Sequence, residues 1–287
     1  MSLKLMYITN KPEVARIAEN AGVDRIFVDM EYIGKSSRQR VRDSVCSHHT
    51  IEDISNIRKV VTKSDLLVRI NPIHEASADC ISSSEEIDEA INRGADILML
   101  PYFHRLEEIH YFIDKVAGRA RTILLLETAD AVDQMDEILS LDGIDEIHIG
   151  LNDLCIDYGK TFLFELLADG TVESICSRIK EHNRWKKNPL AYGFGGIAAV
   201  GEGLLPAEYI IKDHYRLGSS LAILSRAFCD SSKTEDIKHI QEIFDHGVPG
   251  IRLLEKECML HHDDPEYFLE NHRNLQKKVE RILQGML

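Results

Sequence analysis

Short apolar runs rich in strand-forming residues alternate along this chain with segments of helical periodicity. This alternation constrains the fold more than any other feature, because repeated βα units build a parallel sheet. The runs that fit strands are residues 3–8, 25–29, 66–70, 97–100, 122–126, 146–149, 190–194 and 221–224. The helical patterns between them are residues 13–20, 51–61, 84–93, 106–116, 131–139, 172–182 and 206–215. Eight strands with intervening helices in about 230 residues predict an α/β fold of the (β/α)8 TIM-barrel type rather than an open sheet.

The chain after residue 228 departs from this pattern. It predicts two polar amphipathic helices, at about 234–244 and 265–283, with connections at 247–250 (Gly-Val-Pro-Gly) and 261–264 (His-His-Asp-Asp). We therefore expect a barrel domain at 1–228 and a C-terminal helical extension at 229–287. The extension would either cover the barrel or contact a neighbouring subunit of a homo-oligomer. A long polar loop is expected at 34–50, and long loops in compact domains are more often functional than filler.

Composition narrows the functional classes. The 34 Lys and Arg against 48 Asp and Glu leave a net charge of −14, which opposes binding to nucleic acids and to anionic membranes. No stretch approaches the ~18–20 apolar residues of a membrane span, and the first residues lack the apolar core of a signal peptide. The six cysteines are widely spaced without a C-x-x-C pair, as expected for reduced thiols. A cytoplasmic protein with small-molecule substrates is the expectation.

Polar side chains end several of the expected strands, and (β/α)8 enzymes carry their catalytic residues at the C-terminal ends of strands. Several carboxylates together with arginines would suit a hard divalent cation and an anionic substrate. These strand-end residues are Asp29, Glu31, Arg69, Asn71, Glu127, Asn152, Asp153 and Arg226.

Glu127 and Asp153 form the sharpest pair. They are 26 residues apart, which is one βα unit, so adjacent strands would present both carboxylates to one point at the barrel mouth. Two carboxylates on rigid strands are a plausible site for Mg²⁺ or Mn²⁺. The structural alternative is that Glu127 caps a helix beginning near Ala129 and that Asp153 is an ordinary N-cap.

Arg69 follows a buried strand directly and therefore needs a partner. That partner is either the carboxylate of a substrate or a structural carboxylate such as Glu31. Farther along, Gly195 and Gly196 end the expected seventh strand, and Arg226 ends the eighth. Loops after these strands often bind phosphate in barrels, so these residues are candidates for contact with an anionic group of the substrate.

Four motifs give the chain a resemblance to a known family. They are VRINP at 68–72, GADILMLP at 94–101, LETADAV at 126–132 and IGLNDL at 149–154. In this order, over about residues 22–160, they resemble the HpcH/HpaI aldolase and citrate lyase β-subunit family. The resemblance implies a phosphoenolpyruvate/pyruvate-type barrel, a divalent metal on Glu127 and Asp153, and Arg69 binding pyruvate or a related 2-oxo acid. It also implies oligomer formation through the C-terminal region.

The chain departs from the aldolase pattern at two positions. Tyr32 stands where aldolases of this family carry a proton-transferring histidine, and Leu125 replaces a common glutamine. A tyrosine of ordinary pKa, about 10, is a poor base at neutral pH. The acid–base group would then come from the histidines of the expected loops, which are His48, His49, His74 and His104.

Lys35 and Arg38, which follow the Asp-x-Glu motif, look closer to the citrate-lyase branch. Glu31 and Asp29 are expected to organise the metal ligands or to hold a metal-bound water. No lysine ends an expected strand, which argues against Schiff-base chemistry.

The sequence thus predicts a metal-dependent carbon–carbon lyase of the class II aldolase type, acting on a 2-oxo acid through an enolate. Two alternatives stay open. One is condensation on the same site, in the manner of a citrate synthase or a CoA-ester lyase. The other is a non-catalytic, ligand-binding barrel.

Overall fold

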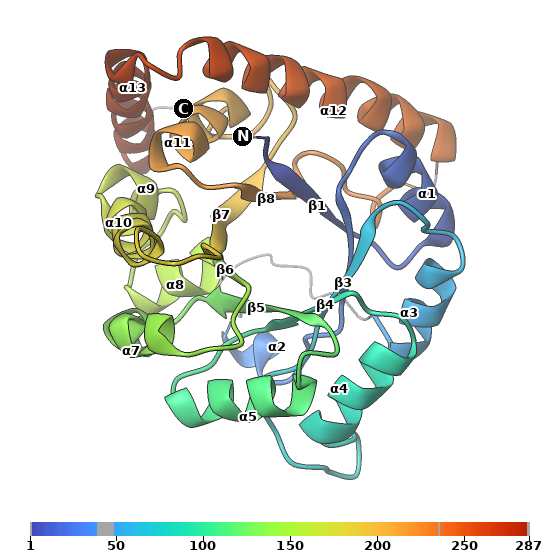
Figure 1. Cartoon of the computed structure of the whole chain (residues 1–287). Coiled ribbons are helices and arrows are strands. Elements are labelled where there is room, and N and C mark those ends of the chain that lie inside the picture. Colours follow the sequence, from blue (N-terminus) through green and yellow to red (C-terminus); the bar gives the residue numbers. More distant parts are fainter. Residues whose placement is uncertain (1, 39–48, 235, 286–287) are drawn as a thin grey trace.

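The computed structural model describes residues 2–38, 49–234 and 236–285. Eight parallel strands close into a barrel in the order β1 to β8, with β8 paired to β1 (Figure 1). The predicted TIM barrel is confirmed. The strands are β1 Lys4–Ile8, β2 Arg25–Asp29, β3 Asp65–Arg69, β4 Ile97–Leu100, β5 Arg121–Leu126, β6 Glu146–Ile149, β7 Ala191–Ile197 and β8 Leu221–Leu224.

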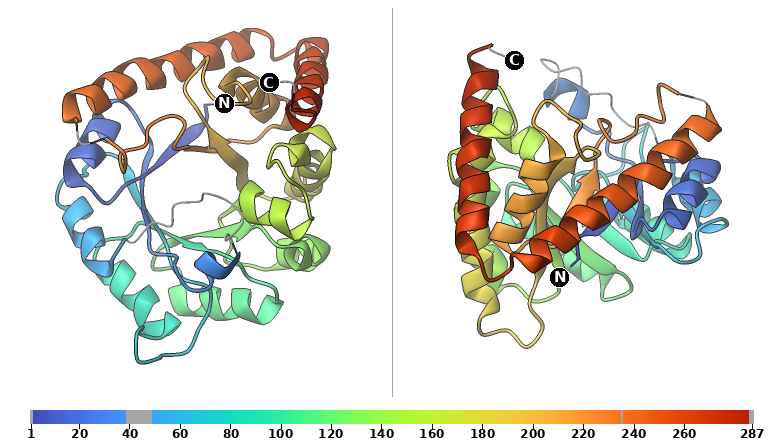
Figure 2. Two further views of the ribbon diagram at one scale, coloured as in Figure 1. Left: turned by 180° about the vertical axis from the view of Figure 1, so that it is seen from behind. Right: turned by 90° about the horizontal axis from the view of Figure 1, so that it is seen from above.

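Helices surround the barrel on the outside, as the views from the two ends and from above show (Figures 1 and 2). Those before the last strand are α1 Pro12–Asn20, α2 Lys35–Arg38, α3 Ile51–Arg58, α4 Ser83–Asn92, α5 Leu106–Val116, α6 Ala129–Asp133, α7 Met135–Ser140, α8 Leu151–Asp157, α9 Glu165–Ala168, α10 Thr171–Asn183 and α11 Ala207–Leu217. After β8 follow α12 Ile237–Leu260 and α13 Pro265–Leu283. The expected helix at 131–139 is two short helices that meet at Gln134. The short helices α2, α8 and α9 have no counterpart in the sequence-based expectation.

Helix α12 corrects the expected connection at 247–250, because this segment is helical and Pro249 lies inside the helix. The buried side chains of Phe244, Val248 and Ile251 continue one apolar face past the proline. Gly247 is required by packing, since a Cβ there would lie 2.5 Å from the ring of Phe228. The glycine is therefore a close-packing residue of the helix and not a turn.

The C-terminal helices cover the barrel. α12 packs against α1 and α11 and so occupies the place of the eighth barrel helix, while α13 packs against α11 and α9. The buried residues of α12 belong to the same hydrophobic core as the outer faces of the strands. The boundary that we place after residue 228 remains a sequence-based prediction.

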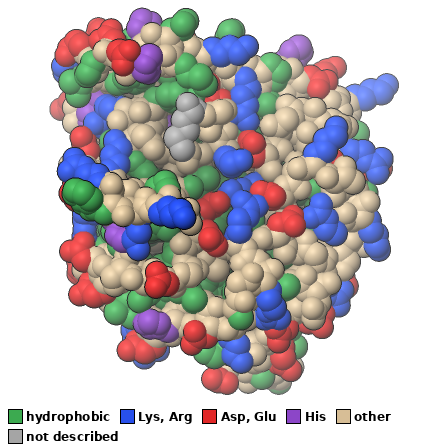
Figure 3. All heavy atoms as spheres, viewed as in Figure 1, with side chains coloured by type: hydrophobic (Ala, Val, Ile, Leu, Met, Phe, Trp, Pro, Cys, Tyr) green, Lys and Arg blue, Asp and Glu red, His purple; other side chains and the backbone are tan. Residues whose placement is uncertain are grey.

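The barrel interior is apolar in its middle, where Met6, Phe27 and Leu67 pack with residues from the facing strands. Nearer the N-terminal ends of the strands, Arg25 of β2 donates two hydrogen bonds, of 2.5 and 2.6 Å, to Glu146 of β6. On the face drawn in Figure 3, acidic and basic side chains are interspersed, so the net charge of −14 does not gather into one acidic patch there.

Two further observations bear on the expected class. Over the described ranges, none of the helices is both long and apolar enough to cross a membrane. Five cysteines are free thiols, namely Cys80, Cys155, Cys176, Cys229 and Cys258. The sixth, Cys46, lies outside the described residues.

Candidate active site

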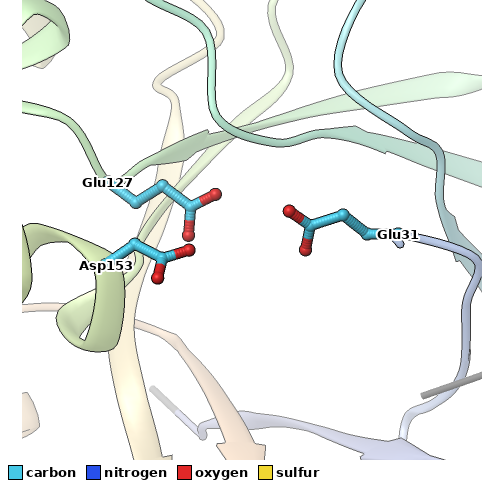
Figure 4. Close-up of side chains that lie close together, drawn as sticks. All are labelled: Glu31, Glu127 and Asp153. Atoms are coloured by element: carbon cyan, nitrogen blue, oxygen red, sulfur yellow. The ribbon is translucent and has the colours of Figure 1, made fainter. Parts of the chain in front are cut away.

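Three carboxylates meet at the C-terminal end of the barrel. Glu31 follows β2, Glu127 follows β5, and Asp153 lies in the first turn of α8, directly after β6. Each offers an oxygen within 4.8 Å of the others, and all three residues are buried. Glu127 and Asp153 lie side by side and Glu31 faces them across a gap (Figure 4). We call Glu31, Glu127 and Asp153 the acidic cluster.

The capping alternative for Glu127 and Asp153 is wrong. Thr128 caps α6, since its side chain accepts a hydrogen bond from the amide of Ala131. Gly150 is the N-cap of α8, which leaves Asp153 in the first turn. Glu127 instead accepts a hydrogen bond from the amide of Tyr102 at 3.0 Å. Glu127 is therefore positioned by the end of β5 and Asp153 by the first turn of α8, and neither residue is an N-cap.

The surroundings shift the pKa values of Glu127 and Glu31 in opposite directions. Burial, and then the neighbouring charges of Glu31 and Asp153, raise the pKa of Glu127 well above its usual value. Glu31 is also buried, but the cations Arg69 and Lys35 hold its pKa below the usual value. The repulsion within the acidic cluster thus favours the neutral form of Glu127, and a bound cation would favour its ionised form.

Arg69, the last residue of β3, is fixed by Asp29, the last residue of β2. Its Nε and Nη2 donate to the two oxygens of Asp29 at 2.8 and 2.7 Å, while Nη1 lies 3.3 Å from Glu31. Burial raises the pKa of Asp29, but the charges of Arg69 and Lys35 outweigh it and hold the pKa well below the usual range. The structural partner expected for Arg69 is therefore present, and it is Asp29 more than Glu31.

Helix α2 contributes two cations that strand-end reasoning left out of the site. Lys35 lies 3.2 Å from Asp29 and 3.0 Å from Glu31. Arg38 pairs with Glu31, lies 3.6 Å from Asp153 and stacks on the ring of Tyr102. A lysine thus reaches the site from a helix, where it pairs with two carboxylates. The feature of the sequence that could have indicated this lysine is its four-residue spacing from Glu31.

These groups border a cavity of about 690 Å³. Of the residues predicted from the sequence, the cavity is lined by Asp29, Arg69, Glu127, Asn152, Asp153, Gly195, Gly196 and Arg226. Glu31 adjoins them through Arg69 and the acidic cluster. Asn71 is not part of the lining. Its side chain accepts from the amides of Tyr32 and Ile33 and so holds the turn that carries Glu31.

The histidines of the expected loops differ in whether they line the cavity. His49 lines the cavity, and its Nδ1 accepts a hydrogen bond from the amide of Asp29 at 2.9 Å. His74 is hydrogen-bonded to the carbonyls of Pro72 and Ile81, and His104 to the carboxylate of Asp130. Neither lines the cavity. His48 lies outside the described residues.

His148 was missed altogether. It sits in the middle of β6, is buried, and lines the cavity from the barrel interior. The sequence shows only a histidine within the run Glu146–Ile149, which reads as an ordinary strand.

The donor set of the acidic cluster fits a hard divalent cation. It consists of carboxylate oxygens only, which suits Mg²⁺ or Mn²⁺ better than a soft metal. Gly150 brings the backbone of β6 close to Glu127, because a Cβ there would lie 2.6 Å from Glu127 Oε2. Because Gly150 has no side chain, there is space for the carboxylate of Glu127 beside Asp153.

A closed parallel barrel with carboxylates and an arginine at the C-terminal ends of its strands has the construction of a (β/α)8 enzyme. The chain belongs to the HpcH/HpaI aldolase/citrate lyase family, whose model matches residues 4–163, more than half of the chain. The resemblance stated from the motifs is thereby confirmed.

Two curated relatives are aldolases by name. The hydroxypyruvate/pyruvate aldolase of Rhizorhabdus wittichii is 33% identical over 100 residues, which are 33% of this chain and 40% of that protein. The 4-hydroxy-4-methyl-2-oxoglutarate aldolase tasA of Hapsidospora irregularis is 22% identical over 198 residues, 57% of this chain and 65% of that protein. The matches thus span less than two thirds of either relative.

Solved structures share the fold. An HpcH/HpaI aldolase from Desulfitobacterium hafniense superimposes with a TM-score of 0.58 at 16% identity, covering 84% of this chain and 93% of that one. A family protein from Burkholderia cenocepacia gives 0.58 at 13% identity, with coverages of 84% and 95%. At these identities the likeness concerns the fold.

Proposed function

We propose that this protein is a metal-dependent carbon–carbon lyase that acts on pyruvate or a related 2-oxo acid. The observation that carries the proposal is the acidic cluster, whose Glu127 and Asp153 line the same cavity as the Arg69–Asp29 pair. Membership of an aldolase family and the names of the two relatives support it.

In this proposal Glu127 and Asp153 hold the divalent cation, Mg²⁺ or Mn²⁺. Glu31 supplies a third oxygen or holds a water on the cation, since it faces the other two within 4.8 Å. Bound there, the cation supplies Lewis-acid stabilisation of the negative charge that develops on a 2-oxo acid when the adjacent carbon–carbon bond breaks. Asp29 does not bind the cation in this proposal, but it fixes the side chains of Arg69 and Lys35.

Arg69 orients the carboxylate of the substrate. Asp29 occupies Nε and Nη2, so the guanidinium plane is held before a substrate arrives, and the residue also borders the cavity. The N–H groups that Asp29 leaves free on Nη1 and Nη2 would donate to the planar carboxylate of the substrate. Asn152, Gly195, Gly196 and Arg226 line the same cavity and would contact the remainder of the substrate.

The test is an assay of cleavage and condensation on the purified chain. Pyruvate is offered with an aldehyde or with an acyl-CoA, in Mg²⁺, in Mn²⁺ or in EDTA. We expect metal-dependent turnover with an aldehyde, and loss of turnover in Glu127→Gln. Glu255→Gln is the matched control, because Glu255 is also a buried carboxylate but accepts a hydrogen bond from the amide of Leu3, away from the acidic cluster. Turnover with an acyl-CoA alone would favour the condensing alternative, and equal turnover in EDTA would contradict metal dependence.

We also propose that the C-terminal helices form a contact between copies of this chain. Leu253 and Leu260 of α12 are 70% and 83% exposed, which is unusual for leucines on an otherwise well-packed helix. Light scattering on the wild type and on Leu253→Glu tests this, with a smaller particle expected for the variant. An unchanged mass would place the contact elsewhere or show a monomer.

A further inference from the structure

His148 faces the barrel interior at the bottom of the cavity. Side chains of a strand alternate between its two faces, and Glu146, two residues earlier on β6, reaches across the interior to Arg25. His148 therefore points inward too, and it is 1% exposed. It lines the cavity together with Leu125, its partner in the β5–β6 register.

Glycines of the neighbouring strand lie next to His148. In the β6–β7 register His148 pairs with Gly193, where a Cβ would lie 1.9 Å from the carbonyl oxygen of Leu221. Gly195 and Gly196 follow on β7 and line the same cavity. His148 and the glycines at 195 and 196 thus border the same cavity.

The imidazole brings two polar atoms without a well-formed hydrogen bond among the described residues, although the Gly195 backbone lies near the ring. Within the described part of the chain, neither Nδ1 nor Nε2 has a hydrogen-bond partner of normal geometry. Burial lowers the pKa of His148 to about 4, against a smaller opposing effect of the Gly195 backbone, so the ring is neutral at pH 7. A neutral imidazole offers one donor and one acceptor, and buried polar atoms rarely go without partners. A hydroxyl group, which can donate or accept, can pair with whichever ring nitrogen faces the cavity.

The subsite lies one layer below the acidic cluster. Glu127 comes two residues after Leu125, the partner of His148, and two residues of strand span about 7 Å. That distance is on the scale of a short carbon chain whose carbonyl end is held at the mouth.

We propose that His148 forms a hydroxyl-binding subsite on the floor of the cavity and determines specificity for hydroxylated substrates. The proposal rests on the proposed lyase function and specifies its substrate class. The hydroxyl belongs either to the 2-oxo acid, as in hydroxypyruvate, or to its aldehyde partner, as in glycolaldehyde.

His214 is the natural contrast. It is also buried, but it lies on α11 behind β7, where it stacks on Phe194 with 3.9 Å between ring centroids. Its Nδ1 is hydrogen-bonded to Ser219, and it does not line the cavity. A substitution there disturbs a buried histidine without touching the subsite.

The experiment compares matched substrate pairs on the purified full chain with Mg²⁺ or Mn²⁺. One pair is hydroxypyruvate and pyruvate with the same aldehyde, and the other is glycolaldehyde and acetaldehyde with pyruvate. We expect wild type to prefer the hydroxylated member of one pair, as judged by kcat/KM. His148→Phe should lose at least about tenfold of that preference, mainly through KM, because it removes the hydrogen bonds but keeps a flat ring. His148→Gln should retain part of it, and His214→Gln all of it. The pair that responds identifies which reactant carries the hydroxyl.

Calorimetry of hydroxypyruvate and pyruvate binding to wild type and His148→Phe provides a readout that needs no turnover, and thermal unfolding verifies that the variants are folded. Unchanged preference in folded His148→Phe, for both pairs and in calorimetry, would overturn the subsite. Absence of turnover in wild type, with binding that still depends on His148, would instead refute the proposed lyase function and leave the subsite supported.

Discussion

Replacing Glu127 with glutamine is expected to stabilise the metal-free protein and to abolish its stabilisation by Mg²⁺ or Mn²⁺. The carboxylate of Glu127 lies within 4.8 Å of those of Glu31 and Asp153. At that separation two like charges repel by about 3 kcal/mol for an effective dielectric constant of ~20. Arg69 and Arg38 offset part of this repulsion.

Protonation sets an upper limit on the gain. A glutamate of unfolded pKa about 4.3 can be held protonated at pH 7 for about 3.7 kcal/mol, at 1.36 kcal/mol for each pKa unit. The expected gain in the free energy of unfolding at pH 7 is therefore about 1–3 kcal/mol. Because the folded pKa of Glu127 is raised, its neutral form favours folding at low pH, and this advantage is lost as pH rises above about 4. The gain from the substitution should accordingly be larger at pH 8 than at pH 5.

The assay is urea unfolding in EDTA at pH 5 and pH 8, followed by thermal unfolding with added Mn²⁺. Metal at 100 times its Kd stabilises a folded protein by about 2.7 kcal/mol, which wild type should show and Glu127→Gln should not. Glu255→Gln serves again as the buried-carboxylate control and should keep the response to metal. A metal-free Glu127→Gln that is less stable than wild type, with an unchanged response to Mn²⁺, would refute both the electrostatic reasoning and the assignment of Glu127.

Three further predictions concern neighbouring residues. Arg69→Ala should lower kcat/KM by about 100-fold or more, near 3 kcal/mol of transition-state stabilisation, and near-normal turnover would contradict its role. The pKa of Asp29 is depressed in the folded state, so its contribution to stability is present above about pH 4 and is lost as pH falls further. Urea unfolding at pH 3 and pH 5 should show a smaller acid-induced loss for Asp29→Asn than for wild type, and equal losses would argue against the Asp29–Arg69 pairing. Gly150→Ala should weaken Mn²⁺ binding in calorimetry, because its Cβ would lie 2.6 Å from Glu127 Oε2, whereas an unchanged isotherm would show that the carboxylate has room to move.

The barrel could be predicted because buried parallel strands and amphipathic helices have different periods, and their alternation survives in the chain. Where local rules conflicted with packing, the prediction failed. Gly247 and Pro249 suggest a turn, but the apolar face of α12 continues through them, and Gly247 admits the ring of Phe228. Burial of the whole face outweighs the local cost of the proline.

The residues of the site likewise fall into those that the sequence predicts and those that depend on tertiary packing. Glu127, Asp153 and Arg69 follow from the rule that barrel strands present their C-terminal ends to one mouth, and Glu31 and Asp29 follow as well. Lys35 and Arg38 come from a short helix, whose direction depends on tertiary packing. His148 could not be recognised as a cavity residue, because its surroundings come from strands distant in the sequence, such as Gly193 of β7, 45 residues later.

The most direct test is a crystal structure with Mn²⁺ and pyruvate, with the metal located by its anomalous signal. The account predicts one strong peak, bonded to oxygens of Glu127 and Asp153 at about 2.0–2.3 Å, with the pyruvate carboxylate directed toward Arg69. A peak bound elsewhere, or pyruvate lying away from Arg69 with no metal between Glu127 and Asp153, would contradict it.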